Sequence, residues 1–266
     1  MTGANTDTSA DTKTTWPADV LTLCIDIGGS GFKASVVNSQ GIATTERVRV
    51  DTPYPCPPDR FVDTVRDLVA PQLAGAHRAS VGFPGLVRQG RVIEVPSLSR
   101  SEYGGERDPE LAQAWEGFDL SHALAQVFQL PTKVVNDADM QGCAVIRGQG
   151  LEFVMTLGTG VGTALFNNGT LLPHLELSHA PFRDGLSFDI ALGNAQRKKD
   201  GHEKWVKNVK RAIKAWEETL FFDHLYVGGG NAKYLSASEV GAKGELIPNS
   251  SGILGGVRLW EISHID

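Results

Sequence analysis

Residues 20–37 read VLTLCIDIGGSGFKASVV, which is two apolar runs joined by the turn Gly28-Gly29-Ser30-Gly31. Both runs have the pattern of buried strands, and glycine permits the tight turn between them. Outward from this hairpin, periodicity predicts a strand, a helix and a strand at residues 47–51, 59–73 and 79–83. The first part of the chain therefore has the order β-β-β-α-β, and the last strand is closed by Pro84-Gly85.

The second half of the chain begins in the same way. Residues 152–157 form an apolar run, Gly158-Thr159-Gly160-Val161-Gly162 is a glycine turn, and residues 163–166 resume the strand pattern. An amphipathic helix is expected at 202–221 and a buried strand at 224–227. Gly228-Gly229-Gly230 then opens onto a further expected helix. We therefore predict an α/β protein with two related lobes.

The lobe boundaries follow from these patterns. Residues 1–19 are rich in Thr and Asp and are expected to be a disordered tail. The first lobe is assigned to residues 20–135 and the second to residues 136–266, whose C-terminal helix is expected to pack back on the first lobe. Residues 96–117 lack periodicity and are expected to form a long loop beside the cleft between the lobes.

Composition limits the classes of function. The chain has 266 residues and a net charge of −6, which argues against a protein dedicated to nucleic acid or to an anionic membrane. No apolar run approaches the roughly 20 residues that a membrane helix needs. The three cysteines are far apart and form no metal-ligand pair, which is typical of a reducing compartment. We expect a soluble, cytoplasmic protein that acts on small molecules.

Asn136-Asp137 follows the short apolar run at residues 133–135 and precedes a predicted helix at 138–147. Ligands of open α/β sheets bind at the carboxyl ends of strands, so this pair lies where catalysis is often found. Asp and Asn are also favoured caps of helix N-termini. At this point Asp137 is either a catalytic carboxylate or a helix cap.

The three glycine turns favour phosphate binding, because glycine lets backbone N–H groups approach phosphate oxygens closely. The chain has no G-x-x-x-x-G-K-[ST] string and is not a P-loop protein. Asp26 could orient a Mg²⁺ ion through water, and Ser30 and Thr159 offer hydroxyl groups to phosphate. The alternative is that the turns only connect hairpin strands and that Asp26 caps one of them.

Four motifs occur in a fixed order: DIGGSG at 26–31, PG at 84–85, NDAD at 136–139 and LGTGVG at 157–162. They resemble the motifs of the ROK sugar kinases. ELSH at 176–179 is similar to that family's E-x-G-H sugar motif, although Ser178 replaces the glycine, and SGILGG at 251–256 resembles its C-terminal helix. The resemblance covers about residues 20–260. It implies an actin-like, ribonuclease H-like fold of two duplicated lobes with the sugar in the cleft between them.

The resemblance also implies roles for individual residues. Asp137 would be the general base, with Asn136, Glu176 and His179 as sugar ligands. Asp189 is the nearest candidate for a further acidic residue that contacts the sugar in this family. The residues that would bind the phosphoryl donor come from the glycine turns and their flanks: Asp26, Gly28, Gly29, Ser30, Gly31, Lys33, Gly158, Thr159, Gly160, Gly228 and Gly229. Taken alone, Glu176 and His179 could instead be a capping pair.

Two departures point to one branch of the family. Gly31 stands where many members have lysine, and the resulting order G-S-G-x-K, with Lys33, resembles the polyphosphate glucokinases. Residues 180–197 contain no cysteine, so the family's zinc cluster is missing and no zinc is expected. Mg²⁺ is expected to be carried by the donor phosphates, with help from Asp26 and without direct protein ligands.

The predicted helix at 202–221 carries Lys204, Lys207, Arg211 and Lys214 along one face, and residues 197–199 upstream are also basic. Such a track could guide a polyanion to the cleft, or it could be a solvated helix face. We expect a homodimeric glucokinase that uses polyphosphate, ATP or both. The alternatives are an ATP-dependent kinase of another hexose and a non-catalytic sugar-binding protein. A ROK-like repressor is disfavoured, because residues 1–19 are too few for a DNA-binding domain.

Overall fold

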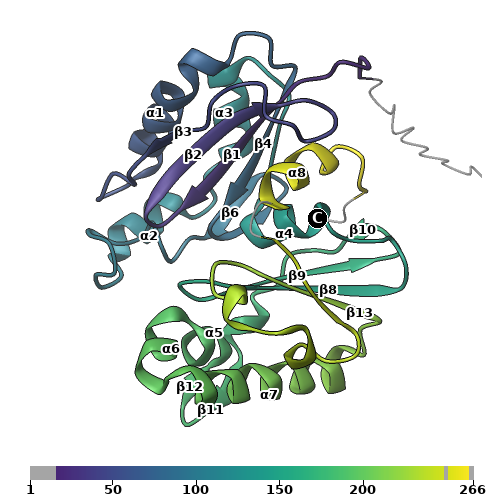
Figure 1. Cartoon of the computed structure of the whole chain (residues 1–266). Helices are drawn as coiled ribbons and strands as arrows, with labels where there is room; N and C mark the ends of the chain where they lie inside the picture. Colours follow the sequence, from purple (N-terminus) through teal and green to yellow (C-terminus); the bar gives the residue numbers. More distant parts are fainter. Residues whose placement is uncertain (1–15, 249–250, 264–266) are drawn as a thin grey trace, which may run out of the picture.

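The computed structural model describes residues 16–248 and 251–263, which form two lobes, each built on a five-stranded sheet (Figure 1). Most of the predicted tail, residues 1–15, lies outside the described residues. Trp16 belongs to the described part and packs edge-on against Trp260, with 5.2 Å between the ring centroids.

The first sheet has the strand order β3-β2-β1-β4-β7. Strand β1 is central, pairing with β2 in antiparallel and with β4 in parallel orientation. The five strands of this sheet are β1 (Thr22–Gly28), β2 (Gly31–Val37), β3 (Val48–Val50), β4 (Arg78–Phe83) and β7 (Thr132–Asn136).

The second sheet repeats this pattern with the order β10-β9-β8-β13-β14. Its central strand β8 pairs with β9 in antiparallel and with β13 in parallel orientation. The strands are β8 (Leu151–Leu157), β9 (Val161–Asn167), β10 (Thr170–Leu171), β13 (His224–Gly228) and β14 (Gly244–Leu246).

The two glycine turns occupy equivalent positions in the two sheets, between the central strand and its antiparallel neighbour. The turn between β1 and β2 belongs to the first lobe and the turn between β8 and β9 to the second. This duplication is the actin-like, two-lobed fold that the sequence predicts, so the predicted fold class is confirmed.

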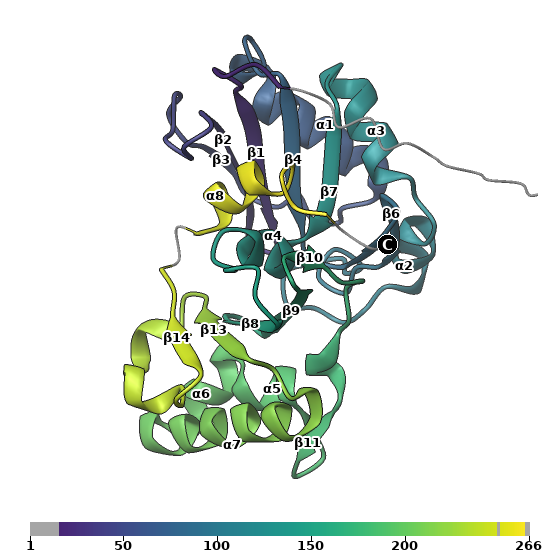
Figure 2. The ribbon, with the colours of Figure 1, turned by 90° about the vertical axis from the view of Figure 1, so that its right-hand side faces the viewer.

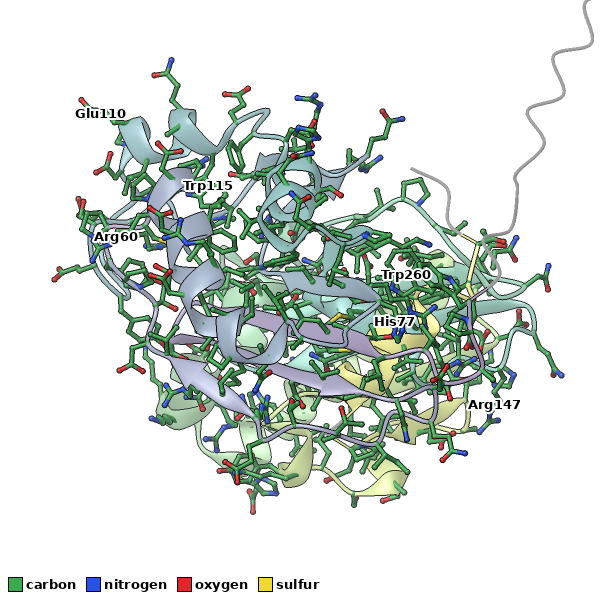
Figure 3. The ribbon with its side chains drawn as sticks, turned by 90° about the horizontal axis from the view of Figure 1, so that it is seen from above. Arg60, His77, Glu110, Trp115, Arg147 and Trp260 are labelled. Atoms are coloured by element: carbon green, nitrogen blue, oxygen red, sulfur yellow. The ribbon has the colours of Figure 1, made fainter. Side chains whose placement is uncertain are left out.

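Helices α1 (Pro58–Val69) and α3 (Leu120–Phe128) pack against the first sheet and close its core. Pro58 stands in the first turn of α1, where its missing N–H costs nothing, and the Asp119 carboxylate caps α3 by accepting from the backbone N–H of His122. Trp115, at the end of α2 (Pro109–Trp115), is buried against two phenylalanines of this core. Viewed from above, Trp115 and Trp260 lie toward different ends of the lobe (Figure 3).

The second sheet has helices on both faces. Alternate residues of a strand point to opposite faces, and in β8 Phe153, Met155 and Leu157 pack in one cluster with the long helix α7 (His202–Leu220). Val154 points the other way and packs in a cluster with Ala138 of α4 (Asp137–Cys143). Helices α5 (Phe188–Leu192) and α6 (Asn194–Asp200) lie on the α7 side (Figure 2).

Helices α4 and α8 (Ser251–Arg258) lie between the two sheets (Figures 1 and 2). The Ser80 hydroxyl of β4 donates to the Gly256 carbonyl over 2.6 Å, which joins α8 to the first sheet. The Arg258 guanidinium donates to the carbonyl of Ala144, just after α4, over 2.9 Å. The chain thus enters the second lobe through α4 and returns to the first sheet in α8.

Some local expectations were wrong. The segment after Gly230 forms only the 3-10 turn η3 (Ala232–Tyr234) instead of a helix. The loop at residues 96–117 contains the short helix α2, and α4 ends at Cys143 rather than continuing to residue 147. The hairpin of β5 (Leu86–Arg88) and β6 (Arg91–Glu94) and the short helices α5 and α6 had no predicted counterpart.

Candidate active site

A cleft of about 690 Å³ runs between the two glycine turns. Gly28, Gly29 and Ser30 line it from the first lobe, and residues 158–162 line it from the second. The remaining lining residues come from the loops and strand ends between the turns: Tyr54, Pro84, Pro96, Ser97, Arg100, Tyr103, Gly104, Asn136, Asp137, Thr156, Glu176, His179 and Asp189. The cleft therefore combines backbone amides, carboxylates and an imidazole in one concave surface.

Asp137 is the first residue of α4 and follows directly on strand β7. Its carboxylate accepts from the backbone N–H of Ala138 over 2.9 Å. Burial, and then the nearby negative charge of Asp26, raises the pKa of Asp137 to about 7. A carboxyl group with that pKa can exchange a proton with a substrate hydroxyl near neutral pH.

Asn136 is the N-cap of α4, and its side-chain oxygen accepts from the backbone N–H of Ala138 over 2.7 Å. Its amide nitrogen donates to the Gly85 carbonyl over 3.1 Å. The capping function that the sequence left open for this strand end is therefore taken by Asn136. Asp137 is left with a carboxylate that lines the cleft.

Glu176 and His179 lie at the two ends of a single 3-10 turn, η2 (Leu177–His179). Their side chains are 3.7 Å apart, between the Glu176 carboxylate and His179 Nε2. The second carboxylate oxygen of Glu176 lies 3.5 Å from Nε2 of the buried His174. Burial alone would raise the pKa of Glu176, but His174 and then His179 hold it below its usual value, so the carboxylate is ionised.

The first glycine turn is held in place by two side chains that the sequence analysis did not select. The Thr52 hydroxyl donates to the Gly28 carbonyl over 2.7 Å. The Tyr54 hydroxyl lies 2.8 Å from the Gly29 carbonyl and 3.0 Å from the Ser97 carbonyl. Tyr54 therefore links the turn to the loop that carries Arg100 and Tyr103, both of which line the cleft.

The second glycine turn is held by Asp189. Its carboxylate accepts from the backbone N–H of Val161 over 2.7 Å, and a Cβ at Gly160 would overlap it. The third turn is tied to the second, because the Asn231 side chain donates to the Gly158 carbonyl over 2.9 Å. Gly229 has φ +83°, and a Cβ there would overlap the backbone of Leu157, so this close approach requires glycine.

Asp26 and Lys33 line a second, smaller pocket of about 230 Å³ that also reaches Asp137. Asp26 lies 3.5 Å from the Lys33 ammonium and 3.9 Å from the Arg47 guanidinium, measured to the same carboxylate oxygen. Gln141 of α4 lines the same pocket. Two positively charged side chains, Lys33 and Arg47, thus line a pocket that Asp137 also lines.

Asp26 is the residue of the second pocket that could meet a metal ion carried by phosphate groups. Within residues 16–248 and 251–263, no three His, Cys, Asp or Glu side chains are grouped to hold an ion. Asp26 is 41% exposed and could meet a hydrated Mg²⁺ through water. The three cysteines are buried and free.

Most of the predicted site residues meet in the main cleft, and the exceptions are informative. Asp26 and Lys33 lie in the second pocket, and Gly31 begins β2 and lines neither pocket. Gly228 pairs with Thr156 at the end of β13, and Gly229 lies against the backbone of Leu157, just before the turn at Gly158. The residues that sequence reasoning missed are Tyr54, Ser97, Arg100, Tyr103, Thr156, Arg47, Asp139 and His174. For Ser97, Arg100 and Tyr103 the aperiodic loop at 96–117 was the available signal, and for Asp139 it was the NDAD motif at 136–139. The others depend on tertiary contacts between distant segments.

The cationic face of α7 does not line the cleft. Helix α7 covers the face of the second sheet opposite α4, so the sheet separates it from Asp137 (Figure 2). Lys207, Lys210 and Arg211 have no ion pair within the described part of the chain, whereas Lys204 pairs with Asp200 and Lys214 with Glu218. Helix α6 contacts α7 and also reaches the cleft, because the N–H of Asn194 donates to the Gly158 carbonyl.

None of the described helices combines the length and the hydropathy needed to cross a membrane.

Comparison with known proteins yields consistent similarities. A sequence model of the ROK family matches residues 22–174. Polyphosphate glucokinase of Mycobacterium tuberculosis is 29% identical over 215 residues, which are 77% of this chain and 76% of that protein. The crystal structure of inorganic polyphosphate/ATP-glucomannokinase from Arthrobacter sp. strain KM superposes with a TM-score of 0.75 at 27% identity, covering 91% of this chain and 99% of that one. A ROK family glucokinase from Streptomyces griseus, solved with glucose and AMPPNP, shares the fold with a TM-score of 0.66 at 17% identity, covering 90% of this chain and 98% of that one.

Proposed function

The chain belongs to the ROK family, and on that premise we propose that it is a hexose kinase that transfers a phosphoryl group to a hydroxyl of glucose. The observation that carries the proposal is the position of Asp137. Asp137 lines the cleft between two glycine turns, and Glu176 and His179 line the same cleft. A proton acceptor, a set of polar side chains suited to a sugar and two phosphate-binding turns are the parts that this reaction needs.

On the acceptor side, the ionised Glu176 carboxylate and the His179 imidazole would bind adjacent sugar hydroxyls. Asn136 has both polar atoms of its side chain in internal hydrogen bonds, so we propose that it contacts the sugar only while capping α4. Asp189 uses its carboxylate to hold the second glycine turn and also lines the cleft, which leaves it within the proposed sugar site.

Asp137 would accept the proton of the attacking hydroxyl. General-base assistance of this kind contributes about 10²–10⁴-fold to the rate. The raised pKa of about 7 is favourable for the role, because a carboxylate near that pKa is a stronger base than an exposed aspartate and is still ionised in a large fraction of molecules at neutral pH.

On the donor side, the backbone amides of the turns at 28–31 and 158–160 would bind the transferred phosphoryl group, assisted by the Ser30 and Thr159 hydroxyls. Gly228 and Gly229, in the third glycine turn, would also contribute to binding of the donor. Mg²⁺ bound to the donor phosphates would neutralise their charge, and Asp26 is the residue that would meet its water shell. Lys33 and Arg47 would border the outgoing phosphate chain from the second pocket.

We propose polyphosphate as a donor, with ATP used as well. The order G-S-G-x-K, the lack of a cysteine cluster and the similarity to enzymes named polyphosphate glucokinase and polyphosphate/ATP-glucomannokinase support this choice. The three free, buried cysteines are consistent with a cytoplasmic protein. We further propose that the protein is a homodimer, which sedimentation experiments test. We also propose that the first lobe ends at residue 135 and the second begins at residue 136, so that Asn136-Asp137 lies at the junction.

The direct test is a phosphate-transfer assay of the purified full chain with glucose, mannose and N-acetylated hexoses, each with ATP or polyphosphate and Mg²⁺. Formation of glucose 6-phosphate supports the proposal. Transfer to a different hexose with ATP alone would identify a ROK kinase of another sugar. Sugar binding by calorimetry without transfer from either donor would identify a non-catalytic sugar-binding protein.

A further inference from the structure

We propose that His174 is a positioning residue that carries a proton on both ring nitrogens and, as an imidazolium, holds the Glu176 carboxylate in the sugar site while bound to Asp139 of α4. The part of this proposal that concerns the sugar rests on the proposed function. The part that concerns the protonation of His174 does not.

The imidazole of His174 lies between two carboxylates. Its Nδ1 is 3.0 Å from Asp139 Oδ1, and its Nε2 is 3.5 Å from Glu176 Oε1. The side chains of His174 and Asp139 are 3% and 4% exposed, and that of Glu176 is 25% exposed. The group is thus shielded from water at the end that meets α4 and open to the cleft at the Glu176 end.

When both carboxylates are ionised, only one charge state of His174 suits both neighbours. A neutral imidazole has one N–H, so one ring nitrogen would direct its lone pair at a carboxylate oxygen. Nε2 is buried and has no hydrogen-bond partner within 16–248 and 251–263, and its nearest charged neighbour is Glu176. Protonation of both nitrogens turns this repulsive contact into an attraction at each end.

The electrostatic balance agrees with this geometry. Burial alone would lower the pKa of His174, but Asp139 and then Glu176 raise it to about 10. His174 is therefore charged throughout the neutral range, which keeps Glu176 ionised. The charged groups that face His174 are Asp139 from α4 and Glu176 from the start of η2, and the Arg88 side chain of β5 donates to its carbonyl over 2.7 Å.

The backbone of residues 174–176 accepts hydrogen bonds from both lobes, which supports a positioning role for His174. Arg88 belongs to the β5–β6 hairpin of the first lobe. The Thr163 hydroxyl of β9, in the second lobe, donates to the carbonyl of Leu175 over 2.9 Å. The residues from His174 to Glu176 are thus held on either side, and His174 joins them to the helix that begins with Asp137.

The same charge acts on the proposed base. Burial, Asp26 and Asp139 raise the pKa of Asp137, whereas His174 and the Ala138 N–H lower it. Removal of the imidazolium would leave the negative charge of Asp139 uncompensated, so the pKa of Asp137 would rise further. A change at His174 should therefore affect sugar binding and the pH dependence of transfer together.

The first experiment observes the proton itself. Long-range ¹H–¹⁵N correlation spectra of the full chain labelled with ¹⁵N-histidine are recorded at pH 8, with His174→Asn to assign the signal. Both ring nitrogens of His174 are expected to have imidazolium shifts. A neutral tautomer of His174 at pH 8 would overturn the proposal, whatever the enzyme assays show.

The second experiment uses kinetics with the hexose identified by the transfer assay. His174→Asn is expected to raise the hexose KM about 10- to 100-fold, the loss typical of a hydrogen bond to a charged group, and to leave the donor KM within twofold. The acidic limb of the kcat profile should move to higher pH. His122→Asn is the matched control and should change none of these values. Equal changes in both KM values, or an unmoved limb, would contradict a positioning role.

Asp139→Asn provides a signature that a purely structural role would not produce. Loss of one carboxylate lowers the pKa of His174, so the imidazolium is lost as pH rises through the neutral range. The hexose KM of this variant should increase about tenfold between pH 6 and pH 9, while that of the wild type stays constant. A KM that is independent of pH in the variant would refute the coupling through Asp139. Should His174→Asn fail to fold, the spectra of the wild type and the kinetics of Asp139→Asn still decide the question.

Discussion

The carboxylate of Asp189 accepts a hydrogen bond of 2.7 Å from the backbone N–H of Val161, and it thereby fastens helix α5 to the second glycine turn. A residue predicted to contact the sugar thus also supports the proposed phosphate-binding backbone. The two functions make different kinetic predictions.

Asp189→Ala removes the acceptor, and the turn at Gly160 loses its support. We expect the donor KM to rise about tenfold, as is typical for loss of a hydrogen bond to a charged group, whereas Asp189→Asn keeps an acceptor oxygen and should have a smaller effect. Steady-state kinetics with each substrate varied in turn measures both. An increase confined to the hexose KM would show that Asp189 acts as a sugar ligand alone.

The pKa of Asp137 predicts an acidic limb in the rate profile. Protonated Asp137 cannot accept the hydroxyl proton, so kcat should fall as pH drops through about 7. Asp26→Asn removes a neighbouring negative charge, lowers the pKa of Asp137 and should move the limb to lower pH, even if the overall rate also falls. Asp51→Asn, at an exposed residue paired with Arg49, is the control and should leave the limb in place. A limb that moves to higher pH in Asp26→Asn would rule out this assignment.

The position of α7 predicts a dependence on donor length. Lys207, Lys210 and Arg211 have no ion pair among the residues that the structure describes, and α7 lies across the sheet from Asp137. Only a long polyanion could therefore contact them while its end is in the cleft. Lys207→Glu combined with Arg211→Glu should raise the KM for long polyphosphate severalfold and leave those for tripolyphosphate and ATP unchanged. Added salt should weaken binding of the long donor to the wild type most steeply, because each neutralised phosphate releases counterions. Equal effects on all donors would show that the face is merely a solvated surface.

The close packing of α8 against its neighbours predicts that a larger residue at Gly255 destabilises the protein. A Cβ at Gly255 would overlap the carbonyl of Met140 in α4, and one at Gly256 would lie 2.6 Å from Cys24 Sγ. Gly255→Ala should therefore lower the free energy of unfolding by about 1–3 kcal/mol, although alanine favours helix elsewhere. Leu254→Ala, at a side chain that is 37% exposed, is the comparison and should cost less. Urea denaturation of both variants measures the difference; a Gly255→Ala variant as stable as the wild type would contradict this packing.

The sequence allowed the duplicated fold to be predicted because its signals are local. An apolar run, a glycine turn and a second apolar run are contiguous at residues 20–37 and again at 152–166, and both became hairpins at the centre of a sheet. Short elements such as α5 have too few residues for a helical period to be visible. The helix expected after Gly230 did not form because Asn231 is tied to Gly158 and the chain turns again at Ser236, where Glu239 completes a capping box.

Candidate site residues could be selected from the sequence only where they belong to a short contiguous motif. Asp137, Glu176 and His179 come from two separate motifs and line one cleft. Which of Asn136 and Asp137 caps α4 depends on side-chain orientation, and only the structure shows that Asn136 takes this role. The pairing of Asp139 with His174 joins residues from two segments, and no periodicity or spacing reports such a contact.

The central claim is that Asp137 is the base, and Asp137→Asn tests it most directly. In the folded protein the pKa of Asp137 is about 7, above the ordinary value of 3.8, so the stability that its protonated form contributes is lost as pH rises from about 4 through 7. Asp137→Asn should therefore be at least as stable as the wild type at pH 8. A thermal melt checks that the variant is folded. With that established, kcat for phosphoryl transfer to glucose should fall by about 10²–10⁴-fold while sugar affinity measured by calorimetry changes little. A folded variant that retains a tenth of the wild-type kcat would contradict the account.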